Sequence, residues 1–277
     1  MPELPEVETA RRLAARVAVG RRIVDVWCAA DPIVFETAPP RVRAALKGRR
    51  VVATGRHGKH LWLALDRRPW LVMHFGMTGG LHAPQRPSPR LMSSRGSRPA
   101  GWPPRFARLR LVFDDGGELV MADARRLGRI RLRQDPRAEP PLSLLGFDAL
   151  HELPAPARFY ALLHDRTAPM KALLLDQTFA AGVGNWIADE VLYQARIDPR
   201  RPARTLTPAE SARVRARLRS VLRISVRAGS DSDRYPRAWL FHHRWDHDAL
   251  ARTARGERIR WETLGGRTTA WAPSVQR

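Results

Sequence analysis

The first residues of the chain could carry chemistry at a backbone nitrogen. The sequence opens Met1-Pro2-Glu3, and removal of Met1 would leave Pro2 with a free secondary amine. A terminal amine has a lower pKa than a lysine side chain, so it can be a neutral nucleophile near pH 7. It can attack an aldehyde-like carbon to form an iminium ion, and Glu3 could move the protons that this requires. Many proteins begin in this way without such chemistry, so these residues alone are a weak indication.

Two further segments could hold phosphate groups. Between residues 173 and 195, Gly182 and Gly184 permit a tight turn, and we expect Asn185 to cap the helix that follows. A glycine turn that leads into a helix N-terminus presents backbone N–H groups to an anion. The segment 56–60, RHGKH, places a lysine between two expected strands. Taken alone, the first segment is equally an ordinary helix hairpin, and the second is equally a solvated turn.

The elements that must position these residues change from helix to strand and back to helix. Residues 2–17 carry apolar side chains at helical spacing, and Pro5 suits a first turn. Short β-rich runs separated by turn residues follow, which is typical of a β-sandwich. These runs cover 22–28, 50–55, 60–65, 70–75, 106–113, 118–123 and 129–133. A stretch rich in Pro, Ser, Arg and Gly at 84–104 interrupts them and is predicted to be a loop.

The second half of the chain is predicted to be mainly helical. A proline-rich hinge at 135–141 leads into a helical region. There, residues 207–210, TPAE, form a capping box with proline at the first helical position, and an apolar stripe at helical spacing follows. The last forty or so residues carry tryptophans at β-like spacing, so we expect the chain to end in strands.

Composition and charge limit the classes of function. The chain has 277 residues and a formal net charge of +22, spread along its length, which indicates a polyanionic partner. Nucleic acid is the first candidate and a membrane surface the second. No apolar run of about 18 residues and no basic-then-apolar N-terminal segment occur, so we expect neither a membrane span nor a secretory signal. The single cysteine, Cys28, excludes an internal disulfide and any metal site with two thiolates, and we expect it to be buried in a strand.

Several motifs in a fixed order make the chain resemble one family. They are MPELPEVE at the start, GKHLWL from Gly58, HFGMTG from His74, DQTFAAGVGNWIADEVL from Asp176 and GGRTT from Gly265. Across almost the whole chain they are similar to the formamidopyrimidine-DNA glycosylase / endonuclease VIII family. The resemblance implies an α+β fold with an N-terminal catalytic helix and β-sandwich at 1–134, a hinge at 135–146, a helix–two-turn–helix DNA-binding domain at 147–235 and a finger hairpin at 236–277.

The resemblance also implies an activity. Members are bifunctional DNA glycosylases and AP lyases of base excision repair, which remove oxidised or ring-opened bases through a Schiff base and nick the strand by β/δ-elimination. Pro2 matches the nucleophile that attacks C1′ of the damaged nucleotide, Glu3 the general acid/base and Glu6 a supporting carboxylate. The implied partner is damaged double-stranded DNA. We expect no cofactor and no metal, no membrane association, a monomer, and a location in the cytoplasm or nucleoid.

Some residues match positions that grip the DNA backbone in that family. Lys59 and Asn185 match phosphate-binding side chains, and Arg267 matches an arginine at the tip of the C-terminal hairpin. Lys171 matches a lysine that lies near the DNA or the base pocket. Such contacts hold and bend the backbone without reading sequence.

Other residues match positions that act where the base leaves the duplex. A base inside a duplex cannot be reached, so it must be extruded, and an apolar plug can hold the gap open. Met77 matches this plug, Arg125 matches the side chain that faces the unpaired partner base, and Leu127 lies where a second wedge belongs. For Met77 a core position is the serious alternative, because a methionine after a strand is usually buried.

The end of the chain departs from the family pattern. The typical bacterial member ends in a four-cysteine zinc finger, whereas Ala272 and Val275 stand where the final cysteine pair would be, and the first pair is absent as well. We therefore expect a zincless finger, a β-hairpin held by packing instead of metal. His242, His243 and His247 leave another metal site open, although their spacing gives it little support.

Two other classes of protein compete with this interpretation. A non-catalytic protein of the same fold would bind damaged or structured DNA without cleaving it, and intact Pro2 and Glu3 argue against that. A tautomerase would use Pro2 as a base, but such chains are usually small and not strongly basic. Length and charge therefore disfavour the tautomerase.

Overall fold

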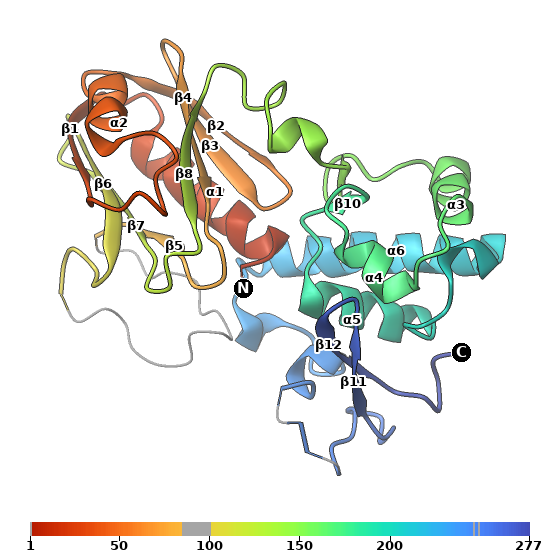
Figure 1. Ribbon diagram of the computed structural model, residues 1–277. Coiled ribbons are helices and arrows are strands. Elements are labelled where there is room, and N and C mark those ends of the chain that lie inside the picture. Colours follow the sequence, from red (N-terminus) through yellow and green to blue (C-terminus); the bar gives the residue numbers. More distant parts are fainter. Residues whose placement is uncertain (1, 85–100, 246, 249) are drawn as a thin grey trace. The chain divides into compact units, whose positions relative to one another are not determined.

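The computed structural model describes residues 2–84, 101–245, 247–248 and 250–277, and it divides the chain into two compact units (Figure 1). Unit 1 contains Met1–Leu144 and Gly229–Ser232, and unit 2 contains Leu145–Ala228 and Asp233–Arg277. Most of the loop expected at 84–104 lies outside the described residues.

Unit 1 is a helix packed on two antiparallel four-stranded sheets, in the orders β1-β6-β7-β5 and β2-β3-β4-β8. Helix α1 (Leu4–Ala18) contacts strands of both sheets, and its apolar side chains share one core with them. The first sheet comprises β1 (Ile23–Cys28), β5 (Gly80–His82), β6 (Ala107–Phe113) and β7 (Glu118–Ala122). The second comprises β2 (Val51–His57), β3 (His60–Leu65), β4 (Trp70–His74) and β8 (Arg129–Arg133). The expected β-sandwich is confirmed.

Each β-rich run expected from the sequence contains a strand whose ends lie within two residues of the predicted ones. Cys28 is buried at the end of β1, and burial raises the pKa of its thiol to about 11, which confirms a structural position. Helix α2 (Pro39–Leu46) and strand β5 of unit 1 were not predicted. Helix α2 buries only Val42 and Leu46, which is too few apolar positions to show a period, and β5 is too short to alternate.

Unit 2 is mainly helical. Its α-helices are α3 (Pro156–His164), α4 (Met170–Leu175), α5 (Asn185–Ala195) and α6 (Pro208–Arg227). Two short strands pair in parallel, β9 (Phe147–Asp148) and β10 (Ala180–Ala181), and the antiparallel hairpin of β11 (Arg260–Leu264) and β12 (Arg267–Trp271) ends the fold. Among the described residues, the 3₁₀ turns of unit 2 are η3 (Ala203–Thr205) and η5 (Leu240–His242), while η2 (Leu142–Leu144) lies in unit 1 and η4 (Ser232–Arg234) spans the boundary of the two units.

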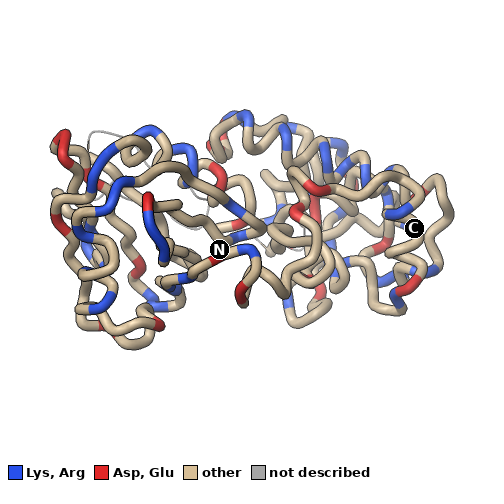
Figure 2. Tube along the Cα trace, turned by 90° about the horizontal axis from the view of Figure 1, so that it is seen from above, with Lys and Arg blue, Asp and Glu red and all other residues tan. Residues whose placement is uncertain are grey.

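Helix α6 shows how local sequence fixes an element here. Thr207 is its N-cap, Pro208 its first residue, and Thr207 and Glu210 form the expected capping box. The buried face packs on α3 and α5. Basic residues recur along the trace of both units, as the distribution of charge along the sequence predicted (Figure 2). Within the described part of the chain, no helix is both long and apolar enough to span a membrane.

Candidate active site and nucleic-acid interface

The N-terminal end of α1 brings together the three residues expected to do chemistry. Pro2 and Glu3 are buried immediately before the helix. Glu3 is the N-cap, and its N–H donates to Glu6 Oε2 at 3.0 Å while the Glu6 N–H donates to the Glu3 side chain. Burial, and next the nearby Glu3 carboxylate, raise the pKa of Glu6 to about 7. This end of the helix therefore holds a carboxyl group that can gain or lose a proton near neutral pH.

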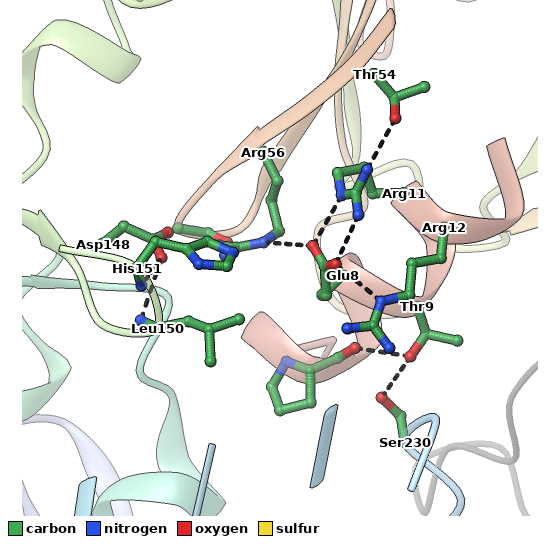
Figure 3. Close-up of polar contacts among 12 residues, drawn as sticks. Glu8, Thr9, Arg11, Arg12, Thr54, Arg56, Asp148, Leu150, His151 and Ser230 are labelled. Atoms are coloured by element: carbon green, nitrogen blue, oxygen red, sulfur yellow. Dashed lines mark hydrogen bonds and ion pairs between the residues drawn. The ribbon is translucent and has the colours of Figure 1, made fainter. Parts of the chain in front are cut away.

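One helical turn further on, Glu8 joins α1 to the strand that leads to Lys59 (Figure 3). Its buried carboxylate accepts hydrogen bonds from Arg11 (2.9 and 2.8 Å), Arg12 (3.0 Å) and Arg56 (3.2 Å). Burial alone would raise the pKa of Glu8, but the hydrogen bond and charge of Arg11 and the charge of Arg56 lower it to about 2. Arg56 Nη1 also donates to the Gly58 carbonyl at 2.9 Å. The ionised Glu8 thus fixes the turn that carries Lys59.

The segment 56–60 is not the solvated turn that its polar sequence allowed. Arg56, His57 and Lys59 are all buried, and Lys59 is only 7% exposed. His60 lies opposite His74 in the sheet, with ring centroids 4.7 Å apart. Burial lowers the pKa of His60 to about 2 and that of His74 to about 4, so both rings are neutral near pH 7.

Asp123 organises the two loops that carry the residues expected at the base gap. Its buried carboxylate accepts hydrogen bonds from Thr78 Oγ1 (2.8 Å), Arg125 N–H (3.2 Å) and Gly128 N–H (2.7 Å). The loops also touch directly, because a Cβ on Gly76 would lie 2.4 Å from the Leu127 carbonyl carbon. Sequence reasoning did not find Asp123.

The three side chains expected at the base gap all keep some exposed surface. Met77 is half-buried, so the core position that competed with a functional one is wrong. Arg125 and Leu127 are exposed, and Leu127 keeps 39% of its surface. The neighbouring Arg126 instead turns to Asp31, with Nε–Oδ2 at 2.8 Å, and anchors the loop from its other side. The structure therefore brings Met77, Arg125 and Leu127 together on adjoining loops of unit 1.

In unit 2 the turn between α4 and α5 is built by side chains of its own sequence. Gln177 donates to the Leu175 and Val183 carbonyls at 2.7 and 2.9 Å and accepts from the Gly182 N–H at 3.1 Å. The N-cap of α5 is Gly184, and Asn185 is the first helical residue. The expectation that Asn185 caps the helix is wrong, because its side chain is used elsewhere.

Asn185 lies beside the terminal hairpin. Its Nδ2 donates to the Thr268 carbonyl at 2.8 Å, and Thr268 follows Arg267 at the hairpin tip. Arg267 is exposed, and Gly265 and Gly266 form the tip at positive φ. Lys171 is placed differently from the expectation, since its side chain is fully buried and pairs with Asp189. In this structure the Lys171 ammonium lies in the interior of unit 2, where it donates to Asp189 and to the Asn185 carbonyl.

The segments around the hairpin are held by apolar packing. Tyr193, Leu240, Ile259, Ala270 and Ala272 form a buried cluster, with Ala251, Trp261 and Val275 packed against it. Two of these, Ala272 and Val275, occupy the expected final cysteine positions.

The three histidines of this region do not converge. His242 Nε2 lies 3.3 Å from the Tyr235 carbonyl, and His247 stacks on Trp261 with centroids 5.5 Å apart. Across the described ranges, no group of three or more His, Cys, Asp or Glu side chains could hold a metal ion.

Comparison with known proteins identifies the family. A family model described as the formamidopyrimidine-DNA glycosylase N-terminal domain matches residues 1–130, and one described as the H2TH domain of that enzyme matches residues 145–236. A formamidopyrimidine-DNA glycosylase of Arabidopsis thaliana is 36% identical over the whole chain, which covers 71% of that relative. One of Thermus thermophilus is also 36% identical, with 98% of the relative covered. The chain belongs to the formamidopyrimidine-DNA glycosylase family.

Solved structures agree with this membership. A structure of MutM in complex with DNA containing carbocyclic 8-oxo-G matches all of both chains, with a TM-score of 0.82 and 25% identity. A Lactococcus lactis formamidopyrimidine-DNA glycosylase, bound non-covalently to DNA with an AP site, gives a TM-score of 0.79 at 23% identity over 99% of each chain. The α4–turn–α5 segment is thus the H2TH motif of the family, and the expected α+β fold is confirmed.

Proposed function

We propose that this chain is a bifunctional DNA glycosylase and AP lyase of base excision repair that acts on oxidised or ring-opened bases in double-stranded DNA. A relative of which this chain covers 98% carries the name formamidopyrimidine-DNA glycosylase. Solved structures of this fold are complexes with damaged DNA. The observation that carries the proposal is the start of α1, where Pro2 and Glu3 adjoin Glu6, whose pKa lies at about 7.

The proposed reaction assigns a step to each group. With Met1 removed, the Pro2 nitrogen attacks C1′, the glycosidic bond breaks and the base leaves with its electron pair. The C1′–O4′ bond then opens, O4′ takes a proton from Glu3, and the nitrogen loses its own proton, which leaves an iminium ion. Loss of a C2′ proton expels the 3′ phosphate, a second elimination expels the 5′ phosphate, and water releases Pro2. Glu6 supports Glu3 through the capping box.

The proposal assigns the remaining residues to holding DNA. Lys59, Asn185 and Arg267 would bind phosphates, and the exposed or half-buried Met77, Arg125 and Leu127 would fill the gap left by the extruded base. Lys171 drops out of the direct contacts because it is buried. The proposed domains are the catalytic helix and β-sandwich at 1–134, the hinge at 135–146, the DNA-binding domain at 147–235 and the finger hairpin at 236–277.

The finger of this member is proposed to be zincless. Support comes from Ala272 and Val275, which pack in an apolar cluster where the pattern of the family has cysteines. Elemental analysis of the purified protein should show far less than one zinc per chain, and a chelator should leave its DNA binding unchanged. Stoichiometric zinc whose removal abolishes binding would contradict the proposal.

Borohydride trapping tests the chemistry. Mixed with an abasic duplex and borohydride, the processed protein should form a covalent band, because reduction fixes the iminium ion. A variant that retains Met1 or carries a blocked terminus should bind the duplex and give no band. Undiminished trapping by the blocked protein would refute the role of Pro2. DNA binding without trapping by the processed protein would favour the non-catalytic alternative.

A further inference from the structure

A single buried carboxylate joins three distant segments of unit 2. Asp189 lies on α5, one turn after Asn185, and its side chain is fully buried. Lys171 of α4 donates to its Oδ1, while Arg244 Nε and the Ala270 N–H of β12 donate to its Oδ2, each at 3.1 Å. These partners are 18, 55 and 81 residues away in the sequence. Asp189 therefore connects both helices of the H2TH motif to the chain on either side of β11.

The partners of Asp189 lead to the two side chains proposed to grip phosphates. Lys171 Nζ also donates to the Asn185 carbonyl at 2.9 Å, at the start of α5. The Arg244 carbonyl accepts from Trp261 Nε1 of β11 at 3.2 Å, and Ala270 is three residues from Arg267 in β12. Asp189 is thus linked to the Asn185 backbone through Lys171, and to the hairpin through Arg244 and Ala270.

The hairpin needs such an anchor to place its tip. A two-stranded hairpin alone is at best marginally stable in water. The apolar cluster lies around Ala270 and Ala272, whereas the tip at Gly265 rests on α4, where a Cβ would come 3.2 Å from the Ala172 Cβ. Within the cluster, the Asp189 carboxylate accepts a hydrogen bond from the Ala270 backbone, and a directed bond of this kind sets the register of β12 against α5 in a way that apolar packing does not.

We propose that Asp189 is a positioning residue for DNA binding: through Arg244 and Ala270 it seats the hairpin against the N-terminus of α5, so that Arg267 and Asn185 meet the DNA backbone as one unit. The assignment rests on the proposed function, which gives those two side chains their phosphates. Neither Lys171 nor Arg244 is needed at the surface for this role, and both are buried.

Loss of one partner of a buried ion pair destabilises a protein whatever the pair is for. A lower melting temperature therefore does not separate positioning from simple stability, and the test must measure coupling. If Asp189 acts through the hairpin, removing Arg267 as well should cost little more affinity. If Asp189 only stabilises unit 2, the two losses should add.

The experiment is a double-mutant cycle in the full chain with Asp189→Asn, Arg267→Ala and the pair. The dissociation constant for a duplex with a tetrahydrofuran abasic analogue is measured well below each melting temperature. Each single variant should bind about tenfold more weakly than the wild type, and the dissociation constant of the double variant should lie within about twofold of that of either single variant.

The control is Asp148→Asn, which removes another buried carboxylate of unit 2, one that accepts from the backbone of Leu150 and His151. It should lower the melting temperature and leave the dissociation constant within about twofold.

A second readout does not depend on DNA. Amide exchange at Ala270 and along β12 should be faster in Asp189→Asn than in Asp148→Asn. If Asp189→Asn does not fold, Arg244→Met, which cuts only the link to the chain before β11, takes its place in the same cycle. Additive losses, unchanged binding by Asp189→Asn or Arg267→Ala, or unchanged exchange would each overturn the proposal. Failure of borohydride trapping by the wild type would refute the proposed activity and leave this coupling intact.

Discussion

Within one helix, environment gives neighbouring carboxylates opposite properties. Glu6 and Glu8 share α1, yet the pKa of Glu6 is raised to about 7 and that of Glu8 is lowered to about 2. Glu6 has burial and a like charge beside it, whereas Glu8 has three arginines. Because the two pKa values differ in this way, Glu6 can exchange protons near pH 7 while Glu8 stays an anion that binds Arg56.

The pKa of Glu6 predicts how stability depends on pH. Its pKa is raised from 4.5, so its contribution to folding is fully present below about pH 4.5 and is lost as pH rises through about 7. Between pH 5 and 8 the free energy of unfolding of the wild type should fall by about 1–2 kcal/mol more than that of Glu6→Gln, since the side chain keeps some contact with solvent. Urea denaturation at several pH values measures this.

A second variant controls for the general effect of removing a carboxylate. The pKa of Glu210 is lowered to about 2 by Arg201, so Glu210 does not titrate between pH 5 and 8. Glu210→Gln should follow the wild-type pH dependence in this window. Parallel curves for Glu6→Gln and the wild type would show that Glu6 is ionised throughout.

At the scale of elements, Asp123 makes one unit of two loops that are far apart in sequence. In Asp123→Asn an amide would face N–H groups that now donate to a carboxylate, and unsatisfied buried groups cost about 1–3 kcal/mol. The loops with Met77, Arg125 and Leu127 should lose their order. Single-turnover excision of a damaged base should then fall about tenfold or more, because extrusion requires the gap to be filled.

The matched reaction for Asp123→Asn is cleavage at a preformed abasic site, where no base has to be extruded. Its rate should stay within about threefold of the wild type. Asp115→Asn, on the exposed turn between β6 and β7, should change neither reaction. An equal loss in excision and abasic cleavage would show that Asp123 serves general folding instead.

The sequence predicted the helices and strands better than it predicted the buried hydrogen bonds and ion pairs that hold them together. The strands alternate and the caps of α6 are local, so their patterns could be seen. The motif residues Pro2, Glu3 and Asn185 stood out by type and spacing. The carboxylates of Asp123 and Asp189 did not, because their partners lie up to 81 residues away and only the tertiary fold brings them together. The burial of Lys171 was hidden for the same reason.

For the molecule as a whole, a net charge of +22 gives general attraction to DNA, and only some charges should meet phosphates. Many arginines are already paired, such as Arg110 with Glu118 at 2.7 Å. Those pairs release no counterion from DNA. The net charge therefore overstates the number of phosphate contacts, and the salt dependence of binding measures the real number.

Salt dependence also tests the proposed phosphate contacts in both units. For Lys59→Gln and Arg267→Gln, the slope of log K against log salt should become shallower by about one unit each, and affinity should fall equally for every lesion. Asn185→Ala should weaken binding with little change of slope, because asparagine carries no charge. Arg110→Gln removes the same charge from a pair that is already neutralised, so its slope should match the wild type.

The Lys59→Gln result is the most informative, since the Lys59 side chain is only 7% exposed. An unchanged slope would mean that its ammonium serves the interior, as that of Lys171 does, and a loss confined to one lesion would point to the base pocket instead.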